Sequence, residues 1–218
     1  MPRLVVATTN RGKLKEIAQL LDAAPVELLT LAEFPGVDAP EENGRTFAEN
    51  ARLKALYYAR HTGELTVAED SGLEIDALDG APGIESARFG GADSTYPEKF
   101  ALIYDALGRR KTAGSTARFV CALALAKDGK VVFETRGTVE GEIAPEPRGS
   151  GGFGYDPIFL YPPFRCTLAE ATAEQKASVS HRGEAFRKLR TYLTDVQRRD
   201  RKDRREKGNH GGKEDTEV

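Results

Sequence analysis

The order of apolar and polar positions predicts that the chain begins with a strand, a loop and a helix. The run from Arg3 to Thr8 is apolar and β-branched, which is typical of a strand. A polar loop follows, in which Asn10 is a candidate N-cap. The next apolar positions take the helical period, at Leu14, Ile17, Ala18 and Leu21.

The rest of the pattern predicts a mixed-sheet α/β protein. The further elements are strands at 27–31, 65–68, 118–126 and 131–138 and helices at about 46–60, 96–107 and 182–196. The dipeptide Asp128-Gly129 separates the last two strands and is a strong hairpin signal. Helices that alternate with parallel-compatible strands, together with one hairpin, are typical of this class.

The chain changes character after Val196, where we expect the last helix to end. From Gln197 to Val218 nearly every residue is charged, glycine or polar, so little apolar surface is available to offset the entropy of ordering. Charges of both signs alternate here, which favours a solubilising tail over a nucleic-acid contact. We therefore predict a single domain over residues 1–196 and a charged, disordered tail over residues 197–218.

Composition narrows the class of protein without identifying it. Of the 218 residues, 39% are hydrophobic and 30% are charged, and no apolar stretch approaches the roughly 20 residues of a membrane helix. The net charge of −2 gives no reason to expect a nucleic-acid partner. The N-terminal run lacks a signal-peptide cleavage site. Cys121 lies in an apolar run, where a free thiol behaves as a small buried hydrophobic residue. These features favour a cytoplasmic protein without a membrane partner.

The loop TTNRGK, from Thr8 to Lys13, is a candidate phosphate site. Its hydroxyls, amide, glycine and lysine surround a helix N-terminus, where backbone N–H groups and the helix dipole attract anions. The loop matches neither the G-x-x-x-x-G-K-[ST] nor the G-x-G-x-x-G motif. A capped turn with a solvated lysine is an equally good interpretation of this segment alone.

The segment VAEDSGLEID places Glu69 and Asp70 side by side after a short apolar run. We expect these carboxylates beyond the carboxyl end of a strand, with Ser71 and Gly72 opening a turn. Paired acids there can hold a hard divalent cation, and Mg²⁺ fits better than Zn²⁺ because the histidines and cysteines are scattered. The alternative is a pair of solvated strand-end acids, with Asp70 in an Asx turn.

Three further clusters are candidates for the same cleft. An acidic loop carries Glu41 and Glu42, and the following helix carries Asn50 and Lys54 four residues apart on one face. The segment SGGFGYDP combines glycines with aromatic rings that could stack on a base or could be buried in the core. The segment KASVSHRGEAFRKL places polar donors at a helix start, or merely caps that helix.

Five ordered segments together resemble the non-canonical purine nucleoside triphosphate pyrophosphatases, the ITP/XTP enzymes. They are ATTNRGKLKEI, TFAENARLKA, AEDSGLEIDALDGAPGIESARFGG, GGFGYDP and SHRGEAFRKL, and the likeness spans Arg3 to Val196. The resemblance implies a homodimeric, two-lobed α/β enzyme with a long central mixed sheet and an active-site cleft between the lobes. It also implies Mg²⁺-dependent hydrolysis of ITP, dITP and XTP to the monophosphate and pyrophosphate, which keeps deaminated purines out of DNA and RNA.

The resemblance also implies a role for individual residues. Asp70 would be catalytic and would share a metal ion with Glu42. The adjacent Glu41 could also align with the metal ligand of the family. Glu42 is preferred because Gly44 follows it at the spacing that is familiar in the family. Thr9 stands where many relatives have Gly. The substrate-binding residues would be Thr8, Thr9, Asn10, Arg11, Gly12, Lys13, Lys54, Ser71, Phe153, Gly154, Tyr155, Asp156, Lys176, His181 and Arg182.

In the mechanism that these roles suggest, Asp70 orients or deprotonates a water molecule that attacks the α-phosphorus. Donors from His181 and Arg182 would pair with the 6-keto group of the base and reject the 6-amino group of adenine. Two alternatives are a hydrolase for another triphosphate, such as a modified pyrimidine, and a nucleotide-binding regulator without turnover.

Overall fold

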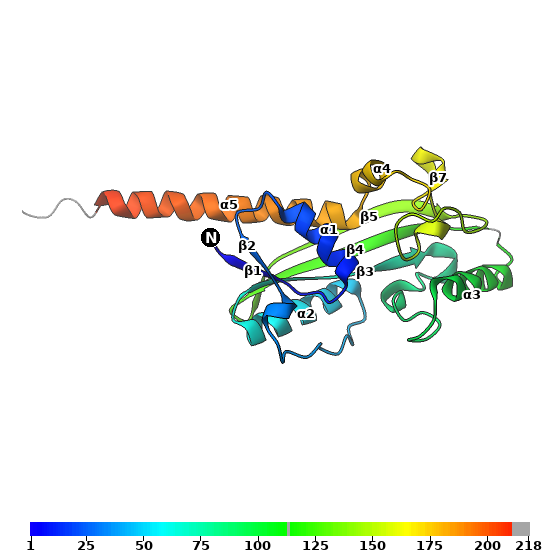
Figure 1. The fold of residues 1–218 in the computed structure, drawn as a ribbon, viewed down its shortest axis with the longest axis horizontal. Coiled ribbons are helices and arrows are strands. Elements are labelled where there is room, and N and C mark those ends of the chain that lie inside the picture. Colours follow the sequence, from blue (N-terminus) through cyan, green and yellow to red (C-terminus); the bar gives the residue numbers. More distant parts are fainter. Residues whose placement is uncertain (113, 211–218) are drawn as a thin grey trace, which may run out of the picture.

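The computed structural model describes residues 1–112 and 114–210, which fold around a seven-stranded mixed sheet (Figure 1). The strands are β1 (Arg3–Val6), β2 (Glu27–Thr30), β3 (Leu65–Ile75), β4 (Thr116–Lys127), β5 (Lys130–Ile143), β6 (Phe159–Tyr161) and β7 (Cys166–Thr167). Their order is β2-β1-β3-β4-β5-β6-β7. Strand β1 pairs in parallel with β2 and β3, and every later pair is antiparallel. The predicted mixed-sheet α/β class is confirmed.

Helices cover both faces of this sheet. The α-helices of the described residues are α1 (Arg11–Leu21), α2 (Phe47–Thr62), α3 (Tyr96–Arg109), α4 (Ala173–Ser178) and α5 (His181–His210). Short 3₁₀ helices are η1 (Leu31–Glu33), η2 (Asp76–Leu78), η3 (Gly83–Glu85), η4 (Asp156–Ile158) and η5 (Pro162–Phe164). Figure 1 shows α1 and α5 on one face, α2 on the other and α3 toward the far end of the sheet. No helix in the described part of the chain is long and apolar enough to cross a membrane.

Three apolar clusters hold these layers together and define two lobes. The first joins α1 and α5 to one face of β1, β3 and β4, and the second joins α2 to the opposite face, largely through alanines. The third lies at the other end of the long strands, where α3 packs against them and against η4 and β6. Because β3 and β4 run through all three clusters, they connect the two lobes.

Strand β3 is longer than the sequence predicts, and this moves the acidic pair. The prediction ends the strand at Ala68 and turns the chain at Ser71 and Gly72, but the strand continues to Ile75. Pairing with β4 stabilises it, because that antiparallel ladder runs from Thr66 through to Ile75. On its other edge, β3 pairs with β1 only as far as Val67. The acidic pair therefore lies within a strand, just past the end of the neighbouring strand.

Helix α5 also extends beyond its predicted end at Val196 and continues to His210. The chain has no aliphatic residue between Val196 and Val218 that could pack this part of the helix against a core. However, no proline or glycine interrupts the chain between Glu184 and Lys207. Arginine, lysine, glutamate and glutamine are good helix formers, and ion pairs such as Arg198 with Asp195 at 3.7 Å support the helix locally. The helix therefore includes residues 197–210, which the sequence assigns to a disordered tail. The remainder of that tail, residues 211–218, lies outside the described residues.

Candidate functional site

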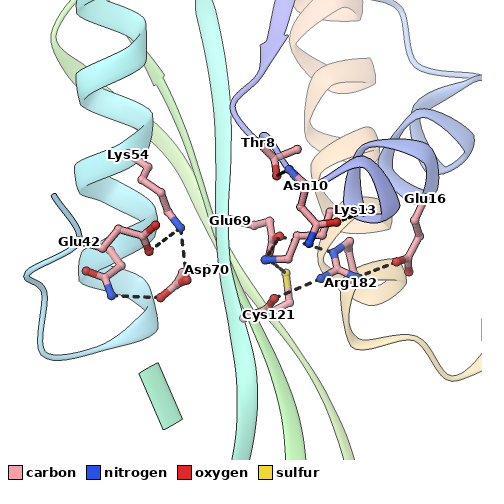
Figure 2. Close-up of polar contacts among 12 residues, drawn as sticks. Thr8, Asn10, Lys13, Glu16, Glu42, Lys54, Glu69, Asp70, Cys121 and Arg182 are labelled. Carbon is pink, nitrogen blue, oxygen red and sulfur yellow. Dashed lines mark hydrogen bonds and ion pairs between the residues drawn. The ribbon is translucent and has the colours of Figure 1, made fainter. Parts of the chain in front are cut away.

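Consecutive side chains of a strand point to opposite faces, and β3 places its two acids accordingly. Figure 2 shows the Asp70 carboxylate on the α2 side of the strand and the Glu69 carboxylate on the side of α1 and α5. The two acids therefore cannot bind one ion together. This corrects the expectation that the pair shares a cation at the mouth of a strand.

On the α2 side, two residues one helical turn apart hold Asp70. The Asn50 amide donates to Asp70 Oδ2 at 3.1 Å, and Lys54 Nζ donates to Asp70 Oδ1 at 3.2 Å. Burial raises the pKa of Asp70, with help from the nearby Glu42 carboxylate, and outweighs the opposing effects of Lys54 and Asn50. Asp70 is therefore a better proton acceptor than an exposed aspartate.

The acidic loop reaches the same point through Glu42. Lys54 Nζ donates to Glu42 Oε2 at 2.9 Å, so one ammonium joins Glu42 to Asp70 (Figure 2). Gly44 donates its N–H to Asn50 Oδ1 at 2.8 Å, and a Cβ at Gly44 would lie 2.6 Å from that oxygen. The glycine thus lets the loop approach α2. Glu41 is exposed, which supports the choice of Glu42.

The loop before α1 is built as its sequence predicts. Asn10 caps the helix and accepts from the Lys13 N–H at 3.1 Å, and Thr8 Oγ1 accepts from the Asn10 N–H at 3.2 Å. Thr8, Thr9, Asn10 and Lys13 line a cavity of about 370 Å³. The exposed Arg11 and Gly12 do not line it, although the resemblance places them at the substrate.

On the opposite face of β3, a buried ionic cluster connects α1, α5 and the strand. Lys13 Nζ lies 2.7 Å from Glu69 Oε1, and Arg182 Nε lies 3.6 Å from the same oxygen. The Arg182 side chain is only 2% exposed and donates to Glu16 Oε2 at 2.6 Å and to Ser71 Oγ at 3.1 Å. Arg182 and Ser71, expected at the substrate, are thus bonded to each other.

Glu16 is the member of this cluster that sequence reasoning missed. Its carboxylate accepts from Arg182 and from Ser180 Oγ, the latter at 2.7 Å, and so fastens α1 to the start of α5. The available signal was its position three residues after Lys13, on the same face of the predicted helix. Other cavity residues that were missed are Tyr58, Arg88, Tyr96 and Phe119.

The glycine-rich loop presents an aromatic ring at the other end of the cavity. Phe153 is 48% exposed, and Lys176 Nζ lies 4.7 Å from the centre of its ring. Asp156 accepts from Lys176 Nζ and, at 2.7 Å, from the Phe153 N–H. Gly154 has a φ of 69°, a left-handed conformation that glycine adopts without strain. This loop therefore combines an open ring with a fixed cation.

Tyr155 and His181 line the same cavity in different environments. Tyr155 is 4% exposed, donates its hydroxyl to the Ser86 carbonyl at 2.8 Å and packs against Tyr96, so its ring belongs largely to the core. His181 stacks on Phe119 with ring centres 5.1 Å apart. Burial, followed by the charge of Arg182, lowers the pKa of His181 to about 3. The imidazole is therefore neutral near pH 7.

One cavity connects the two faces of the sheet beyond the end of β1 at Val6. It extends from Glu42, Lys54 and Asp70 on one face of the sheet, past the loop before α1, to Phe153, Lys176 and His181 on the other. Its volume is in the range of small-molecule sites. Anion-binding groups, a carboxylate with a raised pKa and an exposed aromatic ring thus share one cleft, to which both lobes contribute.

Comparison with known proteins identifies the family of this chain. Residues 4–192 match the Ham1 family. The chain belongs to the Ham1 family. A dITP/XTP pyrophosphatase of Gloeobacter violaceus is 50% identical over 186 residues, which cover 85% of this chain and 91% of that protein. A dITP/XTP pyrophosphatase of Exiguobacterium sibiricum is 45% identical over 192 residues, which cover 88% and 97% of the two chains.

A solved structure supports the same assignment. The HAM1 protein from Coxiella burnetii superposes with a TM-score of 0.84 at 40% identity, covering 89% of this chain and all of that one. This likeness confirms the Ham1-type fold that the sequence resemblance implies.

Proposed function

We propose that this protein hydrolyses non-canonical purine nucleoside triphosphates, namely ITP, dITP and XTP, to the monophosphate and pyrophosphate. This activity would keep deaminated purines out of DNA and RNA. One observation carries the proposal: a single cavity leads from Asp70, with its raised pKa, past the N-terminus of α1 at Lys13 to the exposed ring of Phe153. The names of the relatives point to the same chemistry.

The carboxylates of the site fit a magnesium ion. Mg²⁺ usually takes one or two protein carboxylates and completes its shell with water and substrate phosphates. Glu42 and Asp70 supply two, and both direct an oxygen at Lys54. Among the described residues, no group of three or more His, Cys, Asp and Glu side chains forms a closed metal cage. When bound by Glu42 and Asp70, the ion would neutralise phosphate charge.

In the proposed reaction, Asp70 accepts a proton from the water molecule that attacks the α-phosphorus. Its raised pKa favours this step, and the Asn50 amide holds the carboxylate in place. Lys54 and Lys13 stabilise the negative charge that moves onto the leaving pyrophosphate, as fixed cations do in phosphoryl transfer. Because water attacks directly, the proposed reaction forms no covalent intermediate between a side chain and the substrate.

The base would lie against Phe153, where Lys176 and His181 face it. A lysine ammonium only donates hydrogen bonds, and so it accommodates a keto group and opposes an amino group. A neutral His181 offers one N–H donor and one acceptor. Since Arg182 is engaged with Glu16 and Ser71, we assign the recognition of the base mainly to Lys176 and His181.

The proposal also includes a cytoplasmic homodimer, which the sequence resemblance implies. Both cysteines are free thiols, in keeping with a reducing compartment. Light scattering of the purified protein at micromolar concentration, well above the Kd of a tight dimer, gives the oligomeric state. A mass of one chain throughout would contradict the dimer.

The decisive experiment measures pyrophosphate release from ITP, dITP, XTP, ATP, GTP and dUTP at fixed Mg²⁺. We expect kcat/KM for ITP and XTP to exceed that for ATP by roughly 10⁴-fold, because unpaired buried donors disfavour the 6-amino group. Preference for dUTP would indicate a pyrimidine hydrolase instead. Retention of intact ITP in the presence of Mg²⁺ would indicate a binding protein without turnover.

A further inference from the structure

Each lysine that lines the cavity contacts a carboxylate. Lys54 contacts Asp70 and Glu42, and Lys176 contacts Asp156. The proposed function places Asp70 and Glu42 at the metal, and Asp156 holds Lys176, which faces the base. The third pair, Lys13 with Glu69, has no such role, because Glu69 faces away from Asp70.

Glu69 is the fixed member of its pair. Its side chain is 2% exposed, and it is enclosed by Lys13 Nζ at 2.7 Å, Arg182 Nε at 3.6 Å and Cys121 Sγ at 3.5 Å. A buried carboxylate is costly unless cations stay beside it. Arg182 can stay, because Glu16 and Ser71 hold its other nitrogens.

Lys13 is the member that can change partner. Its side chain is 21% exposed, it lines the cavity, and it lies in the first turn of α1, whose N–H groups point toward an anion. A lysine side chain is long and flexible, so an unrestrained Lys13 would sample many positions in water. Glu69 limits it to one position at the cavity wall.

We propose that Glu69 is a positioning residue for the phosphate end of the site: it holds Lys13 at the start of α1 until a phosphate oxygen replaces it, while Arg182 continues to neutralise Glu69. This inference rests on the proposed function, because it assumes that Lys13 binds phosphate. Such preorganisation raises affinity by reducing the ordering required at the moment of binding. Glu69 itself touches no substrate.

The test uses the full chain and two inhibitors of ITP turnover, inorganic pyrophosphate with Mg²⁺ and the nucleoside inosine. For Glu69→Gln we expect the inhibition constant of pyrophosphate to rise roughly tenfold, as for loss of a buried charge partner. The inhibition constant of inosine should change less than about twofold, and KM for ITP should rise more than kcat falls.

The matched control is Glu16→Gln, which removes the other carboxylate of Arg182 but leaves Lys13 beside Glu69. We expect its pyrophosphate constant to stay near the wild-type value. Lys13→Gln should reproduce the pyrophosphate defect of Glu69→Gln, and the double variant should add little to either, because both changes remove one interaction. If Glu69→Gln does not fold, Glu69→Asp keeps the buried negative charge but shortens the side chain by one methylene, which lengthens the 2.7 Å contact with Lys13.

Several results would overturn the inference. Pyrophosphate binding that is unchanged or tighter in Glu69→Gln would show that Glu69 does not assist Lys13. Equal weakening of pyrophosphate and inosine, or the same defect in Glu16→Gln, would assign Glu69 to holding Arg182 alone. Direct calorimetric titration with pyrophosphate separates this inference from the proposed function, because it reports on Lys13 even if the wild-type protein does not hydrolyse ITP.

Discussion

Glu69 and Asp70 are consecutive in β3, yet they contact different lysines on opposite faces of the sheet, Lys13 at 2.7 Å and Lys54 at 3.2 Å. The end of β1 at Val6 opens the sheet edge beside them, so one cavity reaches both carboxylates. Because each acid has its own cation, their functions can be separated by mutation.

Asp70→Asn should abolish most activity without unfolding the protein. The change keeps the size of the side chain but removes the proton acceptor, and general-base catalysis contributes roughly 10²–10⁴-fold. Lys54 retains Glu42 as a charged partner, which limits the loss of stability. Pyrophosphate release from ITP measures the first effect, and the urea midpoint measures the second. Near-wild-type turnover would remove Asp70 from the catalytic role.

Glu42→Gln and Glu41→Gln form a matched pair that tests the metal site. Glu42 contacts the Lys54 that also contacts Asp70, whereas Glu41 is exposed. We expect Glu42→Gln to raise the Mg²⁺ concentration for half-maximal activity at least roughly tenfold, as loss of metal-site support does. Glu41→Gln should stay within about twofold of the wild-type protein. The reverse ranking would assign the ligand to Glu41.

Local rules predicted the parts of this site that depend on neighbouring residues alone. Asn10 caps α1, as predicted, because its side-chain oxygen can reach an N–H three residues ahead. The spacing of Asn50 and Lys54 placed both on one helical face, and both contact Asp70. These relationships are contained in short stretches of sequence.

Long-range pairing decided the features that the sequence pattern did not predict. The length of β3 depends on β4, about fifty residues later, so the acids could not be placed on opposite faces from VAEDSGLEID alone. Tyr155 is drawn into the core by Ser86 and Tyr96, which are distant in sequence. Arg182 is likewise bonded to Glu16, 166 residues away.

Gly137→Ala should destabilise the fold, whereas Gly108→Ala should not. A Cβ at Gly137 in β5 would collide with the His181 carbonyl and would lie 2.9 Å from the Ala185 nitrogen, so the start of α5 would have to move. Overpacking of this kind costs about 1–3 kcal/mol. Gly108 is in α3 with open space around its Cβ position, and alanine there should stabilise by about 0.4–1 kcal/mol. Urea unfolding of both variants checks the contrast; equal effects would contradict it.

His181 should make the fold less stable as the solution is acidified. Burial lowers its pKa to about 3, below the roughly 6.5 of an unfolded histidine. Between these values the unfolded chain binds a proton that the native protein does not, so the free energy of unfolding falls as pH decreases from about 6.5 to about 3. The slope from this one group is at most about 1.4 kcal/mol per pH unit.

His181→Gln removes that contribution, so its free energy of unfolding should decline less steeply than that of the wild-type protein as pH falls from 7 to 5. His61→Gln is the matched control, since His61 is an exposed histidine on α2 whose ring lies 2.8 Å from the Tyr57 carbonyl. Urea titrations at several pH values give the three slopes. A His181→Gln curve parallel to the wild-type curve would mean that the native imidazole accepts its proton as readily as the unfolded one, and His181 could then be charged when the base binds.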